Sequence, residues 1–342
     1  MNDALRRVRA VLEHPSLLRG TALASLIANV GIVITGGVVR LTGSGMGCPT
    51  WPNCDDDSLV PTHALGIHGR IEFGNRTLIS VVGGLAVACL VLALLRRPRE
   101  RRLLTWAALV FGGVVAQAVL GGATVHTVLN PWIVSTHFLL SIAVIAAAYE
   151  FWTATREPAQ PVRTVTRAPL RALAWLVTAV SVLVLVVGTV VTGSGPNSGD
   201  ANARRTGLDP GMVAQLHADL VMALVGLSVG LWFALRTVAA PRPAVAAAAV
   251  LVGVELAQGA IGFVQFFTHV PAVLVGFHMA GACAVWLATL AMLTQTRGRE
   301  AATVSETHVS ETSAAGRSHP RSGPGPQGRT RRTAKARSAP AR

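Results

Sequence analysis

Long apolar segments, each of the length needed to cross a lipid bilayer, follow one another along this 342-residue chain as far as about residue 295. A helical crossing takes about 20 apolar residues, and helices satisfy their own backbone hydrogen bonds inside lipid. The composition, 51% hydrophobic and 13% charged, agrees with this interpretation. The sequence therefore predicts an all-α integral membrane protein with eight spans: 21–41, 74–95, 103–123, 133–154, 172–193, 213–235, 243–264 and 272–294.

The net charge of +14 raises the question of nucleic-acid binding, but the distribution of the basic residues predicts membrane topology instead. Alternate connecting segments and the tail hold most of them, and basic segments stay in the cytoplasm. We therefore predict a multi-pass protein of the cell membrane with both termini in the cytoplasm and no nucleic-acid partner. The predicted outer side keeps Arg40, Arg70, Arg76, Arg204 and Arg205.

The second half of the chain repeats the first. Gln117 precedes His137 by 20 residues, and Gln258 precedes His278 by the same spacing. Each half contains an even number of crossings, so both halves have the same orientation, as in a parallel repeat. The predicted architecture is two parallel, pseudo-symmetric four-helix bundles side by side.

The expected organisation places these bundles between basic segments. The tail is rich in Ser, Pro, Gly and Arg, which is typical of disorder. It is either solvated without a specific role or in contact with anionic membrane lipid. The predicted parts are a cytoplasmic segment 1–20, a first bundle 21–155 with an outer loop 42–72, a cytoplasmic linker 156–171, a second bundle 172–295, and a tail 296–342.

Two histidines in the second half are candidate metal ligands. His217 and His278 each lie near the outer end of a predicted span, so both could project into one bundle at the same depth. An ionisable residue inside a span is costly and is usually functional. Two such histidines can hold one haem iron from opposite faces, whereas the alternative is a hydrogen-bonded pair across helices. We predict the haem site.

The first half lacks the corresponding pair. His137 has Asn75 where a partner histidine is expected, and an asparagine is a poor haem ligand. His68 lies two helical turns earlier on about the same face, and could replace the missing ligand if its helix begins early. Glu72, one turn from Asn75, is either an acid at a helix end or a proton acceptor beside a bound macrocycle.

The predicted outer surface offers two further groups. Arg40 and Arg76 lie at the membrane edge, where they could pair with haem propionates or with lipid phosphate. Cys48 and Cys54 lie in the outer loop, on the oxidising side, where a disulfide is expected. That disulfide would be either a staple for the loop or a redox-active pair.

Taken together, these motifs resemble the heme A synthase family over about residues 20–295. The paired-cysteine loop and the duplicated histidines carry most of the resemblance. The matching stretches are 42–54, 71–76, 121–125, 130–132, 137–141, 215–219 and 274–279.

The resemblance implies an oxidoreductase that oxidises the C8 methyl of heme O to a formyl group by successive hydroxylations, making heme A for cytochrome oxidase. It implies an iron-containing haem b cofactor between His217 and His278, and a substrate haem in the first half at His137. It also implies catalytic roles for Glu72 and for a Cys48–Cys54 disulfide. The expected partners are heme O, heme A, heme O synthase and an electron donor.

Two departures from the family pattern stand out. The family usually has Glu-x-x-His-Arg in the second span, where this chain has Asn75. The substrate haem would therefore have His137 as its single axial ligand, or His68 as a replacement. Many members also carry a cysteine pair in the loop between the fifth and sixth spans. Residues 194–212 contain none, so a disulfide there cannot be essential.

Two other classes compete with this interpretation. A b-type cytochrome that only transfers electrons would share the bundles and histidines, but would not need Glu72 or the cysteine loop. A transporter would suit the parallel repeat. We expect no charged pathway for it, because Glu150 and Glu255 are interpreted as lying toward the inner ends of their spans, where snorkelling or a helical ion pair accounts for them.

Overall fold

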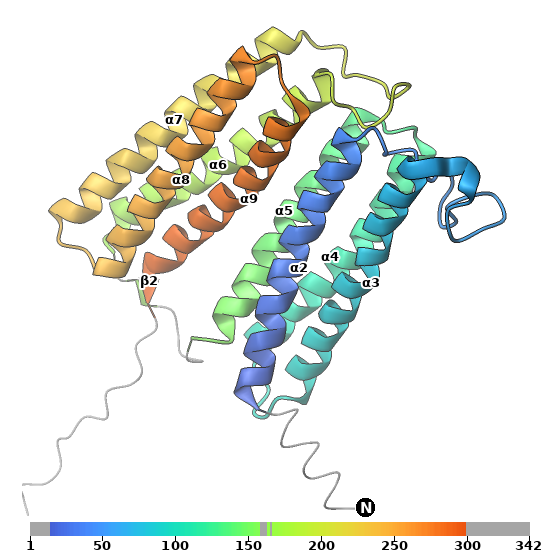
Figure 1. The fold of residues 1–342 in the computed structure, drawn as a ribbon. Helices are drawn as coiled ribbons and strands as arrows, with labels where there is room; N and C mark the ends of the chain where they lie inside the picture. Colours follow the sequence, from blue (N-terminus) through green and yellow to red (C-terminus); the bar gives the residue numbers. More distant parts are fainter. Residues whose placement is uncertain (1–13, 158–162, 165, 299–342) are drawn as a thin grey trace, which may run out of the picture. The chain divides into compact units, whose positions relative to one another are not determined.

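The computed structural model describes residues 14–157, 163–164 and 166–298. Within these residues, eight helices are long and apolar enough to cross a membrane, which confirms the predicted fold class. Most of the predicted tail and segment 1–20 lie outside the described residues. The elements, shown in Figure 1, are α2 (Pro15–Leu41), η1 (His63–Leu65), α3 (Gly66–Leu95), α4 (Arg101–His126), α5 (Pro131–Ala154), β1 (Arg163–Thr164), α6 (Ala168–Ser194), α7 (Pro210–Thr237), α8 (Arg242–Phe267), α9 (Ala272–Gln295) and β2 (Arg297–Gly298).

The eight long helices form two rings of four. In the first ring α2, α3, α4 and α5 each pack against the next helix, and α5 closes the ring against α2. The helices α6 to α9 repeat the arrangement, closed by α9 against α6. Sequential helices run up and down alternately, as the short connections require. In each ring the second and fourth helices therefore face each other across the diagonal.

A buried hydrophobic cluster spans both rings. The helices α2 and α5 of the first ring pack against α9 and α6 of the second, as Figure 1 shows along the middle of the molecule. Leu26, Ile145, Cys283 and Trp286 belong to a single buried cluster that crosses the boundary. The Trp286 indole Nε1 donates a hydrogen bond of 3.0 Å to the backbone carbonyl of Ile142. The halves are thus fixed against each other by apolar packing and by a buried hydrogen bond.

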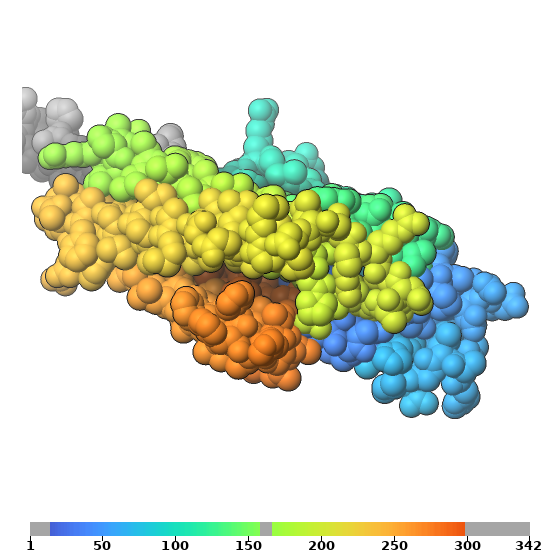
Figure 2. All heavy atoms as spheres, turned by 90° about the horizontal axis from the view of Figure 1, so that it is seen from above, coloured from blue at the N-terminus to red at the C-terminus, as the bar shows by residue number. Residues whose placement is uncertain are grey.

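We call the end of the bundles with residues 43–62, 127–130, 195–209 and 268–271 the loop end, and the opposite end the far end. At the loop end the connectors of the two rings bind each other. Gly45 N donates to Gly199 O at 2.9 Å, and the Arg40 Nε atom donates to Asn197 O at 2.6 Å. In the space-filling view, the connector between α6 and α7 borders the blue, N-terminal part of the first ring (Figure 2).

The helices extend beyond the predicted spans, and the difference matters most for α3. This helix begins at Gly66, so the predicted loop 42–72 is shorter than expected and both His68 and Glu72 are helical. The predicted span began at residue 74, which left Glu72 outside it and Arg76 inside. Instead, Glu72 and Arg76 pair with each other one turn apart and bind the neighbouring loop, so the helix continues through them.

Capping residues set the depth of the histidines. The side chain of Asn130 accepts a hydrogen bond from Trp132 N at the start of α5, and Asp209 does the same for Met212 N at the start of α7. Proline follows each cap, at the first helical position where its missing N–H costs nothing. His137 and His217 therefore both lie about two turns into their helices, on the loop-end side of the bundles.

Candidate functional site

The structure brings His217 and His278 together across the diagonal of the second ring. Their ring centres are 6.4 Å apart and the rings are inclined by 70°. Two imidazoles bound to one metal ion at about 2 Å each would have ring centres roughly 6 Å apart. The pair therefore has the separation that a single metal ion between two histidines requires.

The rings also have unused bonding capacity. The Nδ1 atoms of His137, His217 and His278 are all buried without a hydrogen-bond partner. Buried polar atoms are nearly always paired, so an orphaned atom in a native fold calls for an explanation. Within the described residues there is no group of three or more His, Cys, Asp or Glu side chains that could hold a metal ion. A metal at these histidines would need further ligands, as the porphyrin of a haem supplies.

Glycines of neighbouring helices lie directly against these rings, and sequence reasoning missed their role. A Cβ atom on Gly188 of α6 would be 3.1 Å from Cε1 of His217, and one on Gly262 of α8 would be 3.1 Å from Cε1 of His278. In the first ring a Cβ on Gly121 would be 3.4 Å from Cε1 of His137. Because glycine has no side chain, each imidazole can pack against the next helix.

In each ring, a glutamine on the third helix binds the backbone of the fourth helix at its histidine. Gln258 Nε2 donates to the backbone carbonyl of His278 at 2.7 Å, and Gln117 Nε2 donates to that of His137 at 3.1 Å. Gln117 also donates to the Ser141 hydroxyl at 2.7 Å. The 20-residue spacing in the sequence therefore corresponds to a hydrogen bond between two neighbouring helices of each ring.

The first ring has Asn75 where the second has His217. The Thr35 hydroxyl of α2 donates to Asn75 Oδ1 at 2.7 Å, and Asn75 Nδ2 lies 3.8 Å from a Cβ built on Gly36. His68 takes no part in these contacts. It is exposed in the first turn of α3, where its Nδ1 is 2.9 Å from the hydroxyl of Ser44. Helix α3 does begin early, as the predicted ligand role of His68 requires. The His68 side chain, however, is bonded to the loop.

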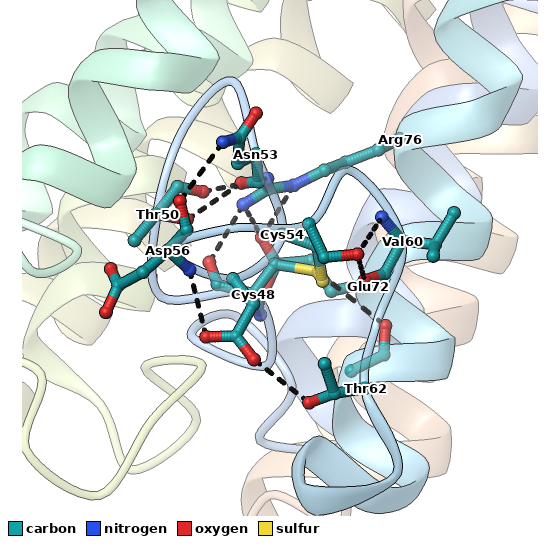
Figure 3. Close-up of a disulfide and its surroundings, with 12 residues drawn as sticks. Cys48, Thr50, Asn53, Cys54, Asp56, Val60, Thr62, Glu72 and Arg76 are labelled. Atoms are coloured by element: carbon teal, nitrogen blue, oxygen red, sulfur yellow. Dashed lines mark hydrogen bonds and ion pairs between the residues drawn. A yellow bond between two sulfur atoms is a disulfide. The ribbon is translucent and has the colours of Figure 1, made fainter.

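The cysteine loop is fastened to α3 by the pair Glu72 and Arg76 (Figure 3). Cys48 and Cys54 form the expected disulfide. Glu72 Oε2 accepts a hydrogen bond of 2.8 Å from Cys48 N, while its Oε1 pairs with Arg76 Nη2 at 2.6 Å. Arg76 Nε also donates to Glu72 Oε1, at 3.1 Å. The other donors of Arg76 bind backbone carbonyls of the loop, at Cys48, Thr50 and Asn53.

The loop also contacts the helix that meets His137. A Cβ on Gly122 of α4 would be 2.7 Å from Cδ2 of Trp51, so this indole lies on the backbone of Gly122. The adjacent Gly121 is the glycine that faces His137. The disulfide loop is therefore held beside the first-half histidine by a salt bridge on α3 and by an aromatic ring on α4.

The two arginines predicted to bind propionates make other contacts in this structure. Arg40 Nη2 donates to Thr192 O at 2.9 Å, in addition to its bond to Asn197 O, and so links the two halves. All five N–H groups of Arg76 have acceptors in Glu72 and the cysteine loop. A propionate at Arg76 would have to replace one of these bonds, whereas Nη1 of Arg40 makes no hydrogen bond with a described residue. The predicted role of both arginines stays a prediction.

The interpretation of Glu255 was wrong about its position. Glu255 lies in the middle of α8, not toward its inner end, and is 3% exposed. Its Oε1 accepts a hydrogen bond of 2.9 Å from the Ser228 hydroxyl, while Oε2 is buried without a partner. Snorkelling cannot explain a carboxyl group at this depth. Glu150, by contrast, lies at the far end and pairs with Arg297 at 2.5 Å.

Eight spans in two pseudo-symmetric rings, with histidines packed inside each ring, define a multi-pass membrane protein with a duplicated histidine site. Residues 19–197, slightly more than half of the chain, match the model of the COX15-CtaA family, described as cytochrome oxidase assembly protein. The chain belongs to this family, and the predicted resemblance is confirmed.

Individual relatives agree with the family. The chain is 32% identical over 142 residues to the heme A synthase of Lysinibacillus sphaericus, which is 40% of this chain and 44% of the relative. It is 32% identical over 129 residues to the heme A synthase of Alkalihalophilus pseudofirmus, covering 36% and 42%. It is 33% identical over 134 residues to that of Bacillus licheniformis, covering 38% and 42%. The matched segments span less than half of each relative.

Proposed function

We propose that this protein is a heme A synthase, an oxidoreductase that converts the C8 methyl group of heme O into the formyl group of heme A. The observation that carries the proposal is the duplicated histidine site, complete in the second half and limited to His137 in the first. Family membership and the heme A synthase relatives support the same activity.

In the second half, His217 and His278 would hold a resident haem b. The separation of the two ring centres, 6.4 Å, fits a metal ion held between them. When bound, it would supply one-electron transfer. The chain's own contribution is to hold both rings rigidly. Gly188 and Gly262 let the imidazoles approach the neighbouring helices, and Gln258 fixes the backbone of His278.

In the first half, His137 would bind and orient the substrate heme O. The oxidation chemistry belongs to the haem and its oxidant, and the chain supplies binding, orientation and electrostatics. Glu72 would accept a proton from the reacting methyl group or stabilise positive charge on its carbon. The hydrogen bonds from Cys48 N and Arg76 hold this carboxylate in place.

The cysteine loop would cover the first-half site at the loop end. The Cys48–Cys54 disulfide would either keep the loop closed or pass electrons as a redox pair, and its anchoring by Arg76 supports the first role. The charge distribution supports placing the loop end outside the cell and both termini inside. The partners would be heme O synthase and an electron donor, with Arg40 and Arg76 as candidate propionate contacts.

The test is pigment extraction from membranes after co-expression with a heme O source, with chromatographic separation of the haems. We expect heme A with the intact chain, and its loss in His137→Ala. The loop histidine variant His269→Ala is the matched control and should leave heme A unchanged. Bound haem b with unconverted heme O would favour the b-type cytochrome instead. A chain that binds no haem would overturn both haem functions.

A further inference from the structure

The two rings place different residues at equivalent positions. Asn75 on α3 lies beside a glycine of α2, as His217 on α7 lies beside a glycine of α6. The helices α3 and α5 are the diagonal pair of the first ring, and α7 and α9 are that of the second. Asn75 precedes His137 by 62 residues, and His217 precedes His278 by 61, so Asn75 corresponds to His217 in the repeat.

An asparagine at this position cannot do what the histidine does. Its side chain ends at the level of the imidazole Nδ1 atom, so it stops short of the Nε2 atom that would reach a metal. Its amide nitrogen has no free lone pair for a metal, but it carries two N–H donors. The Thr35 hydroxyl occupies Oδ1, and Nδ2 makes no hydrogen bond with any described residue. Asn75 thus offers an N–H donor in place of a ligand.

The replacement ligand foreseen in the sequence is held elsewhere. His68 lies two turns nearer the loop end than Asn75, is exposed, and is bonded through Nδ1 to Ser44. The backbone around it is packed as well, because a Cβ on Gly47 would be 2.3 Å from the carbonyl oxygen of His68. The ring would have to give up its bond to Ser44 before it could turn toward the bundle.

We propose that a haem in the first ring has His137 as its only protein ligand, and that its other axial position is open to a small diatomic ligand facing the amide of Asn75. This inference rests on the first-half haem site of the proposed function. It gives the two halves opposite properties. The second ring closes both axial positions of its haem, while the first leaves one accessible to exchange.

Carbon monoxide tests this directly in the purified full-length protein, reduced and loaded with haem. We expect two haems per chain, of which one binds carbon monoxide while the haem at His217 and His278 does not.

Asn75→His should restore the second ligand, make the first haem low-spin, and reduce its carbon monoxide signal at least tenfold. Asn75→Leu should keep the signal but shift the C–O stretching frequency, because the N–H donor is lost. Thr35→Val is the matched control for the orientation of the amide and should shift the same frequency without reducing the signal.

The outcomes separate this inference from the function on which it rests. Two bound haems without any carbon monoxide signal would overturn the inference alone, as would an unchanged signal in Asn75→His. Appearance of the signal only in His68→Ala would assign the ligand to His68 and overturn it too. A single haem per chain, lost in His217→Ala, would overturn the first-half site and with it the proposed function.

Discussion

Gly262 of α8 lies so close to His278 of α9 that a Cβ atom on the glycine would be 3.1 Å from the ring carbon Cε1. Gly188 has the same relationship to His217. Side chains rarely approach this closely, so alanine at either position would press on the imidazole. The orientation of the paired histidines is therefore decided by residues that bear no functional group.

Gly262→Ala should disturb the second-half site more than Gly121→Ala disturbs the first. Overpacking a well-packed interior costs about 1–3 kcal/mol, and here the cost falls on the ring of His278. The equivalent Cβ on Gly121 would be 3.4 Å from His137, an ordinary contact. We expect reduced haem b content and a broadened low-spin spectrum in Gly262→Ala only. Equal effects of the two substitutions would contradict this account.

Arg76→Gln should release the cysteine loop. The Arg76 and Glu72 side chains are 16% and 8% exposed, and removing one partner of a buried pair costs about 3–5 kcal/mol. We expect a lower melting temperature in detergent and faster proteolysis between residues 48 and 62. Arg96→Gln is a matched control, because Arg96 and Glu100 form the same i,i+4 pair with 29% and 21% exposure. That pair should contribute about 0–1 kcal/mol. Similar losses in both variants would refute the anchoring role of Arg76.

Glu72→Gln should leave haem bound while slowing formation of the formyl group. Loss of a general acid or base typically slows a reaction by about 100-fold or more. The readouts are haem content and heme A yield in the same membranes. Arg76→Gln controls for loosening of the loop, because it keeps the carboxylate. If both variants lose heme A equally, Glu72 acts as an anchor for the loop and not in the chemistry.

Glu255→Gln should be tolerated, whereas Ser228→Ala should destabilise the second ring. A glutamine can still accept the Ser228 hydrogen bond, and it removes a carboxyl group from the middle of a span. Removing the serine hydroxyl leaves both Glu255 oxygens without a partner, which costs about 1–3 kcal/mol. Thermal unfolding in detergent measures both. A marked loss of stability in Glu255→Gln would mean that the ionised carboxylate is needed.

Part of this architecture could be predicted from the sequence, because it depends on local periodicity and on segment length. The apolar segments predicted eight spans, and the equal spacings from Gln117 to His137 and from Gln258 to His278 predicted the repeat. The positions of His217 and His278 near the outer ends of their predicted spans placed them at one depth, and the structure brings their rings together. Helix starts were less accurate, since Glu72 and Arg76 neutralise each other and α3 continues through them.

The sequence by itself determined the number of spans, their parallel duplication and the histidines inside them, because membrane insertion and helical periodicity act along the chain. Only the tertiary structure decided what each side chain meets. It placed Gly262 against His278, Trp51 on Gly122, and Glu255 beside Ser228 at mid-helix. These contacts join residues of different helices, and their geometry depends on how closely the helices pack. Spacing along one chain predicts which residues share a face, but the distance between two faces is set by the packing of the whole ring.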